Sequence, residues 1–198
     1  QGGGILNGGV LFIQSSVVSY NQALESGGGI YNLGTLQIVD STLEHNAASE
    51  DDGGGIYNNH GSVALVGSHV FANIGSVAGG IVNIGGRVEL SNTTVSGNRS
   101  PSSGSVARTD GTGGIFNSAG GALMLASSSV FGNTGLDTGG IHSSGVLTIT
   151  GSTLSGNTGG NYGGGLTSFG QLRMVNSTIS GNQTDADGGG LHNRGTAS

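Results

Sequence analysis

The sequence predicts an all-β solenoid, a parallel β-helix of about seven coils, each about 25 residues long, with three short sheets. Three observations predict this fold: a motif that recurs along the whole chain, aliphatic residues at fixed places within it, and an asparagine that closes each copy. A period of 20–50 residues is the sequence signature of a solenoid or array. Successive copies open 25, 26, 25, 34, 26, 25 and 25 residues apart, at the aliphatic residues Ile5, Ile30, Ile56, Ile81, Ile115, Ile141, Leu166 and Leu191.

Within each copy, aliphatic residues or Met stand ten, eight and three residues before the closing asparagine, as Leu36, Ile38 and Leu43 do before Asn46. A spacing of two marks a strand with one buried face. The parity of the buried positions changes between minus eight and minus three, so the chain must turn a corner there. With a further short strand from the opening segment, such as 29–32, each coil contains three strands.

The closing asparagines are predicted to stack at one corner of the coil, because equivalent residues of successive coils lie about 4.8 Å apart. Side-chain amides at this spacing can form a hydrogen-bonded ladder, and Asn tolerates the left-handed conformation of a sharp corner. We interpret the column as structural, since no chemistry needs seven copies. It comprises Asn21, Asn46, Asn73, Asn98, Asn133, Asn157 and Asn182.

Composition narrows the functional classes. The repeat is unbroken over residues 1–198, so we expect a single domain, and neither end shows a cap. The net charge is −6, with no Lys and no basic cluster, which argues against nucleic-acid binding. No apolar run is long enough for a membrane-spanning helix. The chain lacks Cys, which excludes thiolate metal sites, and we expect neither a cofactor nor a metal ion.

One connection is longer than the others. Residues 99–112 form a 14-residue loop that contains Arg99, Arg108 and the only proline, Pro101. Long loops on a rigid scaffold are favoured places for function. The loop is therefore either a tolerated surface insertion or, through Arg99 and Arg108, part of a contact surface.

A second candidate contact surface is the row that follows each opening aliphatic residue, which contains Tyr31, Tyr57 and Phe116. This row is expected outside the barrel, where an apolar stripe usually marks a contact. Lateral association, a platform for stacking sugars and cover by a neighbouring loop remain open as explanations.

Acidic residues gather before several glycine runs, at Asp51 with Asp52, at Asp137, and at Asp185 with Asp187. Clustered carboxylates suit a hard cation such as calcium, but these groups lie on separate coils. We therefore expect solvated turns.

The segments GGGIYN and GGGLHN, with the closing segments VSGN and ISGN, resemble repeats of polymorphic outer-membrane proteins and the wider set of bacterial surface proteins with pectate-lyase-like β-helices. The resemblance covers the whole chain, although Val, Leu or Ile stands here where that family's repeats have Phe. It implies a right-handed parallel β-helix and a passenger or stalk region at the cell surface, often serving adhesion.

We expect a non-catalytic extracellular structural protein, either a surface stalk or a filament subunit. The first and last strands carry the same motif, which favours head-to-tail self-association or covalent continuation in a longer chain. The alternative is an adhesin passenger domain that binds a glycan or a partner protein. A polysaccharide lyase or hydrolase is less favoured; Glu89 and Arg173 are the residues that would carry such an activity.

Overall fold

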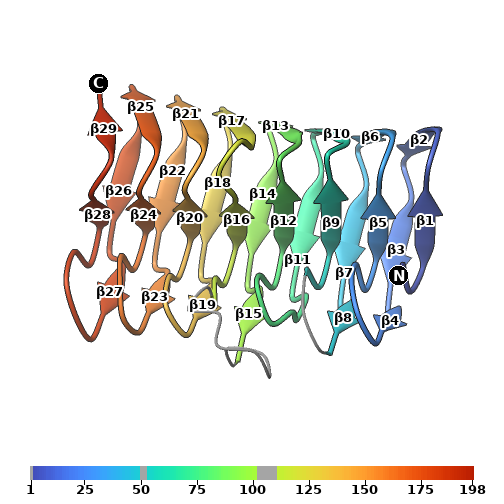
Figure 1. Cartoon of the computed structure of the whole chain (residues 1–198), viewed down its shortest axis with the longest axis horizontal. Coiled ribbons are helices and arrows are strands. Elements are labelled where there is room, and N and C mark those ends of the chain that lie inside the picture. Colours follow the sequence, from blue (N-terminus) through green and yellow to red (C-terminus); the bar gives the residue numbers. More distant parts are fainter. Residues whose placement is uncertain (1, 50–52, 102–110) are drawn as a thin grey trace.

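A computed structural model describes residues 2–49, 53–101 and 111–198 of the chain. Within these residues there is no helix, and 29 short strands wind into one elongated parallel solenoid (Figure 1). Each coil contributes one strand to each of three main sheets, and the strands of successive coils stack side by side along the rod. The predicted parallel β-helix of about seven coils is confirmed.

The first sheet is built from the segments that open the repeats. Its register places like residues over like, for example Ile30 over Ile56 and Asn32 over Asn58. Its strands are β1 (Ile5–Asn7), β5 (Ile30–Asn32), β9 (Ile56–Asn59), β12 (Ile81–Ile84), β16 (Ile115–Asn117), β20 (Ile141–Ser143), β24 (Leu166–Ser168) and β28 (Leu191–Asn193).

The second sheet contains the longest strands, whose burial alternates as expected for strands with one face toward the core. They are β2 (Val10–Gln14), β6 (Thr35–Val39), β10 (Ser62–Val66), β13 (Arg87–Ser91), β17 (Ala122–Ala126), β21 (Val146–Thr150), β25 (Gln171–Val175) and β29 (Thr196–Ala197). The third sheet has three-residue strands, β3 (Val17–Ser19), β7 (Thr42–Glu44), β11 (His69–Phe71), β14 (Thr94–Ser96), β18 (Ser129–Phe131), β22 (Thr153–Ser155) and β26 (Thr178–Ser180).

A fourth, narrower ladder follows the closing asparagines and was not predicted. It consists of β4 (Gln22–Ala23), β8 (Ala47–Ala48), β15 (Arg99–Ser100), β19 (Thr134–Gly135), β23 (Thr158–Gly159) and β27 (Gln183–Thr184). Single bridges from Ala47 to Ile74 and from Ile74 to Arg99 join its two parts. Strands of two residues are too short for any periodicity to reveal.

The core is a single apolar column between the three main sheets. In the second coil, Ile30, Leu36 and Leu43 come from the three sheets, and each is at most 1% exposed. The same three positions are occupied by aliphatic residues in the following coils, so the core is continuous along the rod.

Two corners of each coil take a left-handed backbone. The residue six before each closing asparagine has φ between 47° and 59°, and the residue immediately before it has φ between 51° and 61°. Ala72 and Gly97 occupy the second corner in neighbouring coils, with φ of 51° and 59°. The first of these corners lies where the change of parity required a bend.

Candidate functional sites

The seven closing asparagines lie in one hydrogen-bonded column. Each side-chain Nδ2 from Asn21 to Asn157 donates to Oδ1 of the next asparagine at 2.9–3.0 Å. Each Oδ1 from Asn46 to Asn182 also accepts the backbone N–H of the preceding asparagine at 2.9–3.1 Å. The second Nδ2 proton goes to a backbone carbonyl, as from Asn73 to Leu43 O at 3.0 Å. An interior side chain therefore makes four hydrogen bonds.

A second asparagine column runs through the first sheet, and the sequence analysis did not identify it. Asn7, Asn32, Asn58, Asn83 and Asn117 are joined from Nδ2 to Oδ1 at 2.8 Å. Its sequence signal is the small polar residue two places after each opening aliphatic residue. The column then changes to serine.

Serine weakens this second column at its C-terminal end. Asn117 Nδ2 donates to Ser143 Oγ at 3.0 Å, but the buried Ser168 Oγ has no hydrogen-bond partner. A hydroxyl is shorter than a carboxamide, so two adjacent serines do not span the distance between rungs. The two columns thus differ in continuity.

The aromatic row proposed as a contact surface is largely buried, contrary to the expectation that it lies exposed outside the barrel, and its role as a contact surface stays a prediction. Tyr31 and Phe116 are only 6% and 9% exposed, and Tyr57 is half-buried. Phe116 packs in a small outer cluster with Val77 and Ala78, which belong to the segment that returns toward the first sheet. Of the three explanations left open for this row, cover by neighbouring chain is the one that the packing of Phe116 supports.

The rings of this covered row stack on one another. Tyr31 and Tyr57 have centroids 5.1 Å apart, and those of Phe116 and His142 are 5.2 Å apart. These buried, stacked rings leave little exposed ring surface for a ligand.

The long loop is only partly described. Arg99 lies on β15 with an exposed side chain, and its backbone N–H bonds Asn73 O at 2.9 Å. Arg108 lies outside the described residues, as do Asp51 and Asp52. The role of the loop as a contact surface stays a prediction.

Asp137 is not a solvated turn residue, contrary to expectation. It is 3% exposed, and its carboxylate accepts the backbone N–H of Gly111 at 3.2 Å and Asn161 Nδ2 at 2.6 Å. The carboxylate caps a return segment that folds against the solenoid. Asp185 and Asp187 are exposed, and the described residues contain no group of three or more His, Asp or Glu placed to hold a metal ion.

Glu89 and Arg173 are not brought together. They occupy the same outward column of the second sheet, three rungs apart through Met124 and Thr148, which corresponds to roughly 14 Å. Glu89 forms an ion pair with Arg87 of its own strand.

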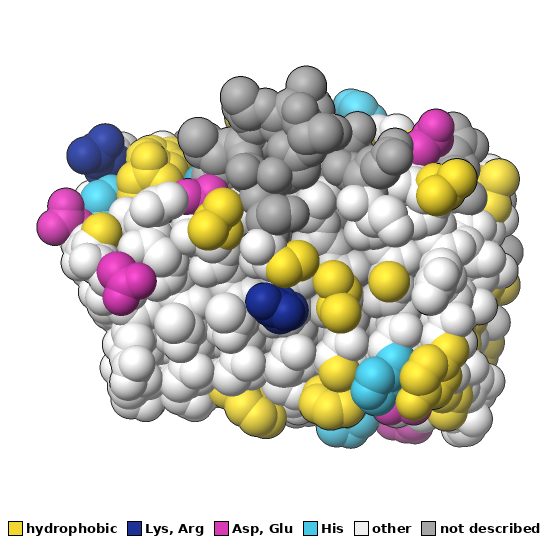
Figure 2. Space-filling view, turned by 90° about the horizontal axis from the view of Figure 1, so that it is seen from below, with side chains coloured by type: hydrophobic (Ala, Val, Ile, Leu, Met, Phe, Trp, Pro, Cys, Tyr) yellow, Lys and Arg dark blue, Asp and Glu magenta, His cyan; other side chains and the backbone are white. Residues whose placement is uncertain are grey.

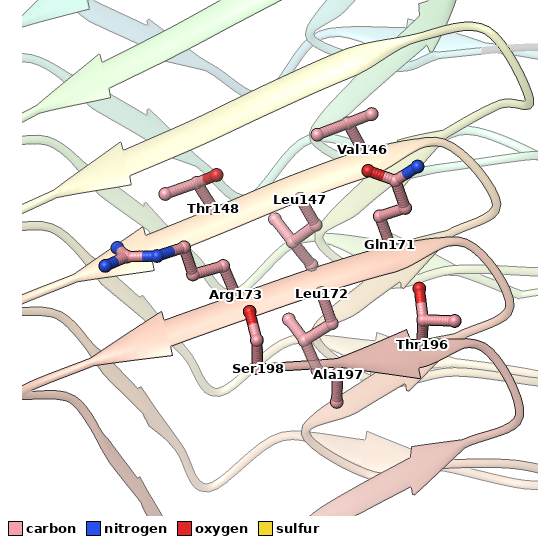
Figure 3. A pocket seen from close by; sticks show the side chains of 9 residues that line it. All are labelled: Val146, Leu147, Thr148, Gln171, Leu172, Arg173, Thr196, Ala197 and Ser198. Atoms are coloured by element: carbon pink, nitrogen blue, oxygen red, sulfur yellow. The ribbon is translucent and has the colours of Figure 1, made fainter.

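A shallow pocket of about 270 Å³ lies beside Arg173, between β21, β25 and β29. Leu147, Leu172 and Ala197 contribute apolar atoms, whereas the Arg173 guanidinium points away from Gln171 and Thr196 (Figure 3). Its lining residues do not place a carboxylate beside the guanidinium.

The third sheet carries an exposed groove that the sequence analysis missed. It has a volume of about 380 Å³ and is lined by Thr42, His69, Phe71, Thr94, Ser96 and Phe131. Phe71 and Phe131 are 41% and 44% exposed. The signal in the sequence was a phenylalanine directly after the buried valine at minus three, which occurs in these two coils.

The long side of the rod in Figure 2 is mostly uncharged, with hydrophobic side chains in small separate groups. No helix in the described residues is long and apolar enough to cross a membrane. Comparison with models of known protein families, with curated proteins and with solved structures gave no match to this chain.

Proposed function

We propose that this chain is a non-catalytic structural protein, a rigid segment of a stalk or filament exposed at a bacterial cell surface. The observation that carries the proposal is the unbroken column of closing asparagines, in which every rung is tied to the next by side-chain and backbone hydrogen bonds. The resemblance to polymorphic outer-membrane-protein-like repeats supports the location.

The rod is expected to be rigid because several continuous sets of contacts link each coil to the next. Three main sheets, a continuous apolar core and two polar columns all run along the same axis. Bending the rod would open hydrogen bonds in several of these columns at once, and unpaired buried polar groups are costly. A solenoid of seven rungs is roughly 34 Å long at the spacing between strands, so the shape suits a spacer.

The uniform register also suits head-to-tail stacking. Each rung pairs with its neighbour in the same way, as in Ile56 with Ile81 and Asn58 with Asn83. A rung from another copy, or from a continuation of the same chain, would form equivalent contacts. Repeated contacts of this heterologous kind build an open filament.

Electron microscopy of the purified chain over a range of concentrations tests this proposal. We expect rods that join end to end and show an axial repeat of about 4.8 Å. An Asn182→Asp variant should join less, because a carboxylate at position 182 cannot donate the hydrogen bond that Oδ1 of Asn21 in the next copy would accept, and its charge would be desolvated at the junction. Single short rods at the highest concentration, or cleavage of a polysaccharide by the purified chain, would contradict the proposal.

A further inference from the structure

The outer face of the third sheet shows an alternation of large and small side chains. Phe71, Ser96, Phe131 and Ser155 lie side by side on β11, β14, β18 and β22, in direct register. The two phenylalanines project from the face, whereas Ser96 is 7% exposed and forms the floor of the groove between them. Along the rod, this column therefore alternates projecting side chains (knobs, Phe71 and Phe131) with recessed positions (holes, Ser96 and Ser155).

The spacing of the knobs suits one additional aromatic ring. Phe71 and Phe131 are two rungs apart, which corresponds to roughly 9.6 Å. A ring midway between them would lie about 4.8 Å from each, and aromatic pairs are favourable at centroid distances of 4.5–7 Å. The strand spacing thus leaves one position between the two phenylalanines, over Ser96, as the place where a further ring could contact both.

We propose that a second copy of this chain docks on this face, with the phenylalanines of the two copies interleaved. The two-fold axis lies in the interface, parallel to the strands and midway between β14 and β18. Phe131 of the second copy then enters the groove over Ser96, and its Phe71 lies over Ser155. A second copy fits because its phenylalanines have the same two-rung spacing. The two-fold axis also reverses the order of its rungs, so each phenylalanine of one copy faces a serine of the other.

The flanking positions are compatible with this arrangement. Across the axis, Thr94 meets Ser129 of the second copy, so hydroxyl faces hydroxyl. His69 meets Thr153 and Glu44 meets Ser180, so neither side chain faces a like charge. Opposite a hydroxyl, His69 and Glu44 each have a hydrogen-bonding partner, and the interface contains no repulsive pair at these positions.

The interface is small. Six rungs of three residues form a rectangle of roughly 29 Å by 10 Å, below the approximately 800 Å² per partner of a standard stable complex. We therefore expect a weak dimer that forms at high protein concentration. This lateral contact is independent of end-to-end stacking, because it uses the side of the rod.

Sedimentation velocity over roughly 10 µM to 1 mM, with the intact chain, tests the proposal. The unmodified chain should shift from monomer toward dimer, and the Phe71→Ser, Phe131→Ser double variant should raise the dissociation constant by about tenfold or more. The matched control is Phe12→Ser with Met124→Ser, which removes two exposed apolar side chains from the second sheet. This control should dimerise like the unmodified chain.

A hole-filling variant separates interleaving from general stickiness. Ser96→Phe places a ring in the groove and adds apolar surface, so interleaving predicts loss of the dimer whereas unspecific association predicts more of it. Thermal unfolding checks that each variant is folded. The proposal is overturned if the chain remains monomeric at 1 mM, if Ser96→Phe associates more strongly, or if the control loses the dimer equally. It is also overturned if a monomeric chain binds chitohexaose through Phe71 and Phe131.

Discussion

The two asparagine columns use the same residue at the same axial spacing, yet only one of them is continuous. In the closing column, Asn73 Oδ1 accepts both Asn46 N–H at 2.9 Å and Asn46 Nδ2 at 3.0 Å, while Asn73 Nδ2 donates to Leu43 O and to Asn98 Oδ1. In the first-sheet column, Asn58 Oδ1 accepts from Asn32 Nδ2, and Asn58 Nδ2 donates to Gly61 O and to Asn83 Oδ1.

The difference lies in the backbone. A closing asparagine accepts the backbone N–H of the closing asparagine before it as well as that residue's side-chain amide, so a replacement would leave both a side chain and a backbone group unpaired. A first-sheet asparagine serves mainly its column. This explains why serine can stand at 143 and 168 while the closing column is Asn throughout.

The largest expected effect is therefore at the centre of the closing column. Asn98→Ala removes four side-chain hydrogen bonds at a fully buried position. Each buried partner left unpaired costs about 1–3 kcal/mol, so we expect a loss of about 4 kcal/mol in the free energy of unfolding, measured by urea denaturation. A loss below about 1 kcal/mol would show that water or rearrangement replaces these bonds.

Asn83→Ala should cost less, about 2 kcal/mol, because one of the four side-chain hydrogen bonds of Asn83 is a long 3.4 Å contact to Ala122 O, and the others include no bond from a backbone N–H. Asn83 and Asn98 are both fully buried, so the two variants form a matched pair. Equal losses in the same urea titration would contradict the distinction between the columns.

Ser168→Asn should stabilise the rod by about 1 kcal/mol, because an amide there can link Ser143 to Asn193 and replace an unpaired hydroxyl. The control is Ser168→Ala, which removes the orphan hydroxyl without adding a link, so the gain of Ser168→Asn beyond that of Ser168→Ala measures the link itself. If Ser168→Asn destabilises the fold in thermal melting, the site lacks room for the longer side chain.

The corner before the closing asparagine gives the smallest effects. Gly156 has φ of 58°, and a Cβ added there would meet open space, so Gly156→Ala should cost about 1 kcal/mol through backbone strain alone. Ala72 occupies the same corner at 51°, and Ala72→Gly should gain a few tenths of a kcal/mol after the entropy cost of glycine. Shifts of the same sign for both variants would contradict this account.

Sequence periodicity predicted the parts of the fold that repeat in every coil. The aliphatic positions represented by Leu36, Ile38 and Leu43 identified the core strands, and the change of parity located a corner. Successive coils stack in the same register, so a residue's position in the repeat determines which residues lie next to it in the coils before and after.

Periodicity could not predict what covers the outside of a coil. Phe116 has the outward parity of an exposed strand residue, but packing against Val77 and Ala78 of another segment buries it. Asp137 is buried for a related reason, because its turn folds back toward Gly111 and Asn161. These contacts depend on the path of irregular segments, which strand parity does not encode.

The groove between Phe71 and Phe131 could be predicted only from the register in which the coils stack. The residues are 60 positions apart in the sequence, with the long loop between them. Only the pairing through Ser96 places them two rungs apart on one face. Parity correctly places both side chains outside the core, but it does not indicate that they flank a groove.

Hydrogen exchange of the asparagine side-chain amides, followed by nuclear magnetic resonance, tests the central claim most directly. If the closing column holds the rod together as one rigid unit, the Nδ2 protons of Asn46, Asn73, Asn98, Asn133 and Asn157 should exchange slowly and with similar protection, because they are released only when the coils separate. Exchange of these protons as fast as that of exposed amides would contradict the claim.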